Sequence, residues 1–240
     1  MPSSRREFMR LAGATAAAFS VAGESGAQTP AASAPPPRPE GPNADEALRL
    51  LQEGNARFVA GRSTRSCRVP DDFNASAEGQ SPMAVIVACA DSRVSPEILF
   101  DQGVGDIFVI RVAGNVVSGA GDTVKGSIEY GVAELNAPLV MVLGHSNCGA
   151  VKAAIKHIDA NDSLPGAIEG LVALVKPAVQ ATRTEPGDKL ENAIRANVVT
   201  GVTKLRGLPP IIAKGVAAGT VKVVGATYEL RTGKVTLLPG

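Results

Sequence analysis

Two apolar runs, each followed by side chains that bind soft metals, constrain the fold of this chain most strongly. The first run covers residues 83–88 and is followed by Cys89; the second covers residues 139–143 and is followed by His145 and Cys148. Short apolar runs bounded by turn residues are typical of buried strands. In an open α/β sheet, ligands bind outside the carboxyl ends of the strands. We therefore expect the two runs to lie in one sheet and the three side chains to meet at one site.

The remaining patterns predict the other layers of an α/β fold. Apolar runs at 107–112 and 221–225 predict two further strands, and residues 226–238 predict a hairpin that turns at Thr232-Gly233. Helical spacing covers residues 44–59, 121–135, 150–158 and 190–205, with a short turn at 97–100, whereas 159–185 gives only helical pieces. We expect a mostly parallel sheet of four strands plus a C-terminal antiparallel strand, flanked by helices, with an N-terminal helical arm.

The N-terminal region has the features of an export signal. Residues 4–10 contain the pair Arg5-Arg6 and resemble the twin-arginine motif of bacterial signals, and an Ala-rich stretch with small residues for cleavage follows. The alternative is an Ala-rich N-terminus without a targeting role. Residues 28–42 are rich in Pro and Ala and predict a flexible linker. The sequence thus predicts a signal at 1–27, a linker at 28–42, a domain at 43–240, and a periplasmic or secreted location.

Composition narrows the classes of function. The net charge is +1, aromatic residues are 3% and Trp is absent, which argues against binding of nucleic acid. No apolar run reaches the roughly 18 residues of a membrane span, so no stable membrane insertion is expected after processing. The three cysteines are too few and odd in number for a disulfide framework. They fit a metal site plus one spare thiol, Cys67, although a Cys89–Cys148 disulfide remains an alternative.

The three predicted ligands are those that zinc prefers. Thiolate and imidazole side chains bind zinc in a tetrahedral array, and three protein ligands leave the fourth position that catalytic sites need. We therefore expect one zinc ion per chain at Cys89, His145 and Cys148. Asp91 lies two residues after Cys89 on an extended strand and so emerges on the same side. Arg93 is placed to hold Asp91 as an ion pair, although Asp91 could also be the fourth ligand in a closed state.

At these residues the chain resembles the β-class carbonic anhydrases. The family pattern Cys-x-Asp-Ser-Arg is matched by residues 89–93, and Gly-His-x-x-Cys-Gly by residues 144–149. The resemblance extends from about residue 45 to 238. It implies a zinc enzyme that interconverts carbon dioxide and bicarbonate, and a homodimer or a multiple of dimers with pockets at the subunit interface.

The resemblance also implies a substrate pocket of the plant type. Two departures stand out: Ala113 is smaller than the expected Val, and Glu134 replaces a His, so no proton shuttle is carried over to it. His157 is expected on a solvated helix face. The implied substrate-binding residues are Gln80, Phe108, Ala113, Tyr130 and Gly149, with Asp91 and Arg93 as the catalytic pair.

The expected function is the zinc-dependent, reversible hydration of carbon dioxide to bicarbonate and a proton. Hydrolysis of carbon disulfide or carbonyl sulfide on the same fold and metal is one alternative. A zinc- or bicarbonate-binding protein without turnover is another, although the intact pair of Asp91 and Arg93 argues against it.

Overall fold

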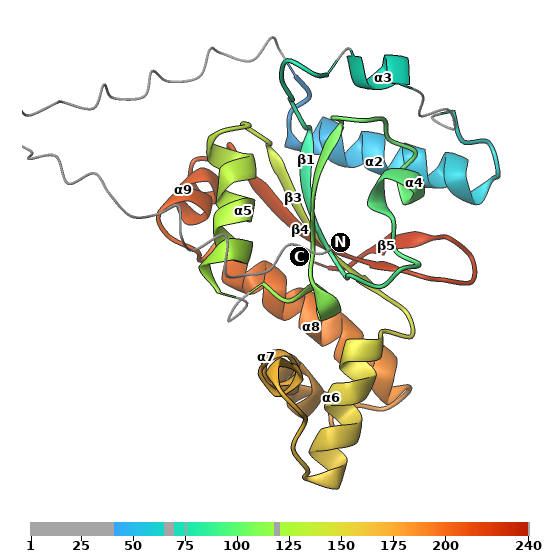
Figure 1. The fold of residues 1–240 in the computed structure, drawn as a ribbon, viewed down its shortest axis with the longest axis vertical. Coiled ribbons are helices and arrows are strands. Elements are labelled where there is room, and N and C mark those ends of the chain that lie inside the picture. Colours follow the sequence, from blue (N-terminus) through green and yellow to red (C-terminus); the bar gives the residue numbers. More distant parts are fainter. Residues whose placement is uncertain (1–40, 65–69, 75, 118–120, 240) are drawn as a thin grey trace, which may run out of the picture. The chain divides into compact units, whose positions relative to one another are not determined.

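The fold is built around a five-stranded sheet with the order β2-β1-β3-β4-β5 (Figure 1). The computed structural model describes residues 41–64, 70–74, 76–117 and 121–239; the predicted export signal, most of the predicted linker and Cys67 lie outside them. β1 (Ala84–Ala88), β2 (Ile107–Arg111), β3 (Leu139–His145) and β4 (Lys222–Tyr228) are parallel neighbours, and β5 (Val235–Leu237) pairs antiparallel with β4. The predicted fold class is confirmed.

The central strands are buried on both faces. Every residue of β1 and β3 is buried, which explains why they appear in the sequence as continuous apolar runs rather than alternating ones. Their side chains divide between two cores. Ile86 and Met141 belong to one core, whereas Val85 and Val142 belong to the other.

Helices cover both faces of the sheet. On one face, Leu51 of α2 (Ala44–Val59) and Leu99 of α4 (Pro96–Leu99) join the core that contains Ile86. The opposite core takes its apolar side chains from three helices, as with Ile128, Val198 and Ile212. These helices are α5 (Asp122–Ala133), α8 (Lys189–Arg206) and α9 (Ile211–Ala217).

The N-terminal helix α2 is defined by its cap and by one buried amide. Asn43 accepts hydrogen bonds from the backbone N–H groups of Asp45 and Glu46, each 3.0 Å long, as its position before the helix predicts. The Asn55 amide then donates to the carbonyl oxygens of Leu99 and Gly233, at 3.0 and 2.9 Å. These bonds fasten α2 to the body of its own chain.

Two further helices pack beyond the sheet against α8. α6 (Gly149–Ala160) and α7 (Ala167–Ala181) share a third core with α8, which includes Val151, Val175 and Ile194 (Figure 1). α7 continues through Pro177, which is why its pattern gave no firm helix prediction. The short helices α3 (Pro70–Asn74) and α9 were not predicted, since helices of five and seven residues carry little periodicity. Within the described ranges, no helix combines the length and apolarity that a membrane span requires.

Candidate metal centre

The site lies where two neighbouring parallel strands end. β1 stops at Ala88, so Cys89 is the next residue, and β3 continues to His145, two residues beyond the predicted end. Ala88 of β1 is in register with Leu143 of β3, which places Cys89 close to the end of β3. Cys148 is the residue that precedes the first turn of α6. The carboxyl ends of two central strands and the amino end of one helix thus supply all three predicted ligands.

The three ligand atoms form a compact, buried cluster. The sulfur atoms of Cys89 and Cys148 and a ring nitrogen of His145 all lie within 4.8 Å of one another. The exposed fractions are 4%, 1% and 0% for Cys89, Cys148 and His145, so all three side chains are buried. Both cysteines are free thiols, and the alternative disulfide is not formed.

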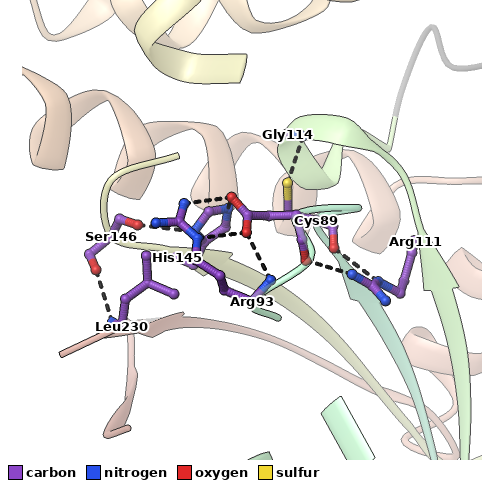
Figure 2. A network of polar contacts seen from close by, with 8 residues as sticks. Cys89, Arg93, Arg111, Gly114, His145, Ser146 and Leu230 are labelled. Atoms are coloured by element: carbon purple, nitrogen blue, oxygen red, sulfur yellow. Dashed lines mark hydrogen bonds and ion pairs between the residues drawn. The ribbon is translucent and has the colours of Figure 1, made fainter. Parts of the chain in front are cut away.

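The two thiols have opposite tendencies to ionise. A hydrogen bond from Cys148 holds the pKa of Cys89 well below its ordinary value. The backbone N–H of Gly114 also donates to the Cys89 sulfur over 3.2 Å, as Figure 2 shows. The same hydrogen bond to Cys89, together with burial, raises the pKa of Cys148. Thiolate is the form that binds metals, and the hydrogen bonds to Cys89 favour that form.

His145 presents an unpaired nitrogen to this cluster. Its Nδ1 lies 3.0 Å from the carbonyl oxygen of Ser146, which can only accept, so Nδ1 carries the proton and Nε2 the lone pair. Nε2 is buried and has no hydrogen-bond partner among the described residues; the nearest carboxylate oxygen, on Asp91, is 3.9 Å away. An unpaired buried nitrogen is costly. A metal ion would satisfy it, and two sulfurs with one imidazole are a ligand set that zinc accepts.

Asp91 and Arg93 form a two-point ion pair beside the cluster. Arg93 Nε donates to Asp91 Oδ1 over 2.9 Å and Nη2 donates to Oδ2 over 2.7 Å, and the Arg93 backbone N–H adds a third bond of 3.0 Å. These hydrogen bonds from Arg93 hold the pKa of the Asp91 carboxyl far below its usual range. Asp91 is thus an ionised acceptor in a fixed orientation.

Arg111 supports this loop, a role that the sequence analysis did not assign. Its Nε donates to the carbonyl oxygen of Cys89 over 3.2 Å and its Nη2 to that of Asp91 over 2.6 Å (Figure 2). The guanidinium therefore braces the backbone on both sides of Ala90. A charged residue within the otherwise apolar run 107–112 was the available signal.

The described chain brings only some of the implied pocket residues to the carboxyl ends of the strands, because Gln80 precedes the amino end of β1 and Phe108 is the second residue of β2. Phe108 of β2 and Tyr130 of α5 have ring centroids 6.1 Å apart, and Tyr130 is half exposed. Ala113 opens the 3-10 turn η1 (Ala113–Asn115), whose Gly114 contacts Cys89. Gly149 is the exposed first residue of α6, and Gln80 is exposed in the segment before β1.

His157 pairs with Asp162 over 2.5 Å at the far end of α6.

Comparison with known proteins identifies the family. The family model described as carbonic anhydrase matches residues 84–235. Carbonic anhydrase 2 of Mycobacterium tuberculosis is 43% identical over 192 residues, covering 80% of this chain and 91% of that protein. The solved structure of the β-carbonic anhydrase CcaA superposes with a TM-score of 0.63 at 28% identity, covering 80% of this chain and 95% of its own. The Coccomyxa β-carbonic anhydrase, solved with acetazolamide, gives 0.61 at 28% identity, with coverage of 80% and 86%. The chain therefore belongs to the β-class carbonic anhydrase family.

Proposed function

We propose that this carbonic anhydrase works with one zinc ion per chain, held by Cys89, His145 and Cys148. The reaction is the reversible hydration of carbon dioxide to bicarbonate and a proton. The observation that carries the proposal is the buried ligand cluster, in which His145 Nε2 has no partner within the described residues. Bound zinc supplies Lewis-acid chemistry that brings the pKa of water toward neutrality, and carbonic anhydrase is the standard example of that effect.

Asp91 orients the water that reacts. Because Arg93 occupies both of its oxygens from one side, the carboxylate stays ionised and can accept a hydrogen bond from that water. We place Asp91 on Arg93 rather than in the fourth metal position, which leaves the site open to water or a small anion. The pairing in the described structure supports this arrangement.

The substrate pocket is the plant-type pocket implied by the sequence resemblance. Carbon dioxide carries no charge, so an apolar wall of Phe108, Ala113 and Tyr130 suits it. Gln80 and the backbone N–H of Gly149 donate hydrogen bonds to its oxygens as negative charge develops. The half-exposed ring of Tyr130 supports a second chain covering this wall, as in a homodimer or a multiple of dimers.

Export by the twin-arginine route is the remaining part of the proposal. The support is the sequence of residues 1–27, with its Arg5-Arg6 pair and Ala-rich stretch. This route carries folded proteins, so the thiols at Cys89 and Cys148 can be bound to zinc before they meet an oxidising compartment.

Stopped-flow measurement of carbon dioxide hydration by the zinc-loaded protein tests the function. We expect turnover far above the buffer reaction and its loss when zinc is removed. The same preparation should be assayed with carbon disulfide and carbonyl sulfide. Faster turnover of either sulfur compound would reassign the substrate, and zinc binding without any turnover would make the chain a binding protein. Relatives named as carbonic anhydrases favour the first outcome.

A further inference from the structure

Ser146 sits between two of the predicted ligands and uses every one of its polar groups. Its backbone N–H donates to the carbonyl oxygen of Tyr228 over 2.9 Å. Its hydroxyl donates to Glu229 Oε1 and accepts from the Leu230 N–H, each over 3.0 Å. Its carbonyl oxygen accepts from His145 Nδ1 over 3.0 Å. Figure 2 shows Ser146 between Leu230 and His145. Three bonds thus fix Ser146 to the end of β4, and the fourth holds the His145 ring.

Glu229 is itself held in place on the other side of this contact. Its Oε1 also accepts from the Arg231 N–H over 3.0 Å. Its backbone N–H donates to the Lys234 carbonyl, and its carbonyl accepts from the Gly233 N–H, both over 2.9 Å. The carboxylate therefore belongs to the turn between β4 and β5 and is a rigid anchor for Ser146.

We propose that Glu229 and Ser146 form a positioning relay that orients the His145 ring and thereby sets the affinity of the site for zinc. The inference rests on the zinc site proposed above. Without the Glu229 contact, the Ser146 hydroxyl loses its acceptor, and the carbonyl that holds Nδ1 is free to shift. Groups that hold the second nitrogen of a ligating imidazole fix its orientation, and their removal commonly weakens metal binding about 10- to 100-fold.

The test measures zinc affinity of the full chain by competition with a chelator. We expect Ser146→Ala and Glu229→Ala to weaken zinc binding by about 10-fold or more. Glu229→Gln should lie between them and the wild type, because an amide oxygen can still accept both hydrogen bonds. The double variant Ser146→Ala/Glu229→Ala should be no weaker than the worse single variant, since both changes break the same connection.

Glu169→Ala is the matched control. Glu169 on α7 also accepts a backbone N–H, from Leu164 over 2.7 Å, but its contact lies in the segment that leads into α7. Its loss should leave the zinc dissociation constant unchanged within twofold.

Cobalt substitution separates positioning from simple stabilisation. The visible absorption of bound cobalt(II) depends on ligand geometry, so it should change in Glu229→Ala and return toward the wild-type spectrum in Glu229→Gln. Unchanged affinity and an unchanged cobalt spectrum in Glu229→Ala would overturn the relay. Wild-type protein that takes up no zinc would instead overturn the metal site itself. If Ser146→Ala does not fold, the two Glu229 variants decide by the same criteria.

Discussion

At the scale of single residues, the candidate metal centre is defined by the protonation of its two thiols and by an imidazole nitrogen that has no hydrogen-bond partner in the described chain. Donated hydrogen bonds lower the pKa of Cys89, and His145 Nε2 is buried without a partner among the described residues. The hydrogen bond to Cys89 and burial raise the pKa of Cys148, and both thiols must be thiolates to ligate a metal. A packed core normally gives such a buried nitrogen a partner, and thiolate and imidazole are the donor types that bind zinc.

Replacing one thiol should abolish metal binding. We expect Cys148→Ser to lose nearly all zinc, because a serine hydroxyl at this position does not replace a thiolate, whereas Cys67→Ser should keep one ion per chain. Elemental analysis of the purified folded proteins measures both. Equal zinc in Cys148→Ser and wild type would contradict the assignment of Cys148.

Removing the partner of Asp91 should separate binding from catalysis. In Arg93→Ala the carboxylate loses its two side-chain donors, so the reacting water loses an oriented acceptor. We expect full zinc content and a fall in kcat/KM on the order of 100-fold. Arg49→Ala, which removes an exposed ion pair with Glu53 on α2, is the control and should keep normal turnover. Wild-type rates in Arg93→Ala would make its pair with Asp91 structural only.

At the scale of elements, close approach of backbone decides where helices can lie. Gly54 of α2 has no side chain at the point where the helix meets the loop after α4; a Cβ there would lie 1.8 Å from the Phe100 carbonyl oxygen. This contact and the two Asn55 hydrogen bonds set α2 against its own sheet. Docking of α2 therefore depends on a residue that weakens the helix locally.

Two glycine substitutions within helices should have opposite effects. Gly54→Ala should lower the free energy of unfolding by roughly 2–3 kcal/mol, because backbone atoms must move to admit the methyl group. Gly126→Ala on α5, where a Cβ would meet nothing within 4 Å, should raise it by about 0.5–1 kcal/mol. Chemical denaturation of the two variants measures both changes. A neutral Gly54→Ala would show that α2 can dock elsewhere.

At the scale of the whole molecule, the candidate metal centre joins segments that are distant in the chain. Cys89 directly follows β1, His145 ends β3, and Glu229, in the turn after β4, accepts a hydrogen bond from Ser146. An assembled centre of this kind needs a folded chain. The export route proposed for residues 1–27 is compatible with that need.

Changing the arginine pair should therefore stop export without affecting the enzyme. We expect Arg5→Lys/Arg6→Lys protein to stay unprocessed in the cytoplasm while remaining folded and active. Cell fractionation with immunoblotting, and an activity assay of each fraction, measure this. Normal processing and a periplasmic location in the double variant would rule out the twin-arginine route.

Local patterns in the sequence were sufficient to predict the strands, most of the larger helices, with α7 as the exception, and the residues that form the candidate ligand cluster. Buried parallel strands give continuous apolar runs, and Asn43 followed by two acids and an apolar stripe is a local signal for the start of a helix. The thiol and imidazole side chains of Cys89, His145 and Cys148 are metal ligands by their chemistry. The prediction of strand three stopped at Leu143 because Gly144 resembles a turn residue, whereas pairing with β4 carries the strand to His145.

The supports of the centre could be known only from the tertiary structure. Arg111 reaches Cys89 across 22 residues, Glu229 reaches Ser146 across 83, and Asn55 reaches Gly233 across 178. Each contact joins groups that come together only when separate elements pack, and the pattern within one segment does not say which distant segment it will meet. The types of ligand can thus be recognised locally in the sequence, whereas the contacts that hold those ligands in position arise from packing between distant segments.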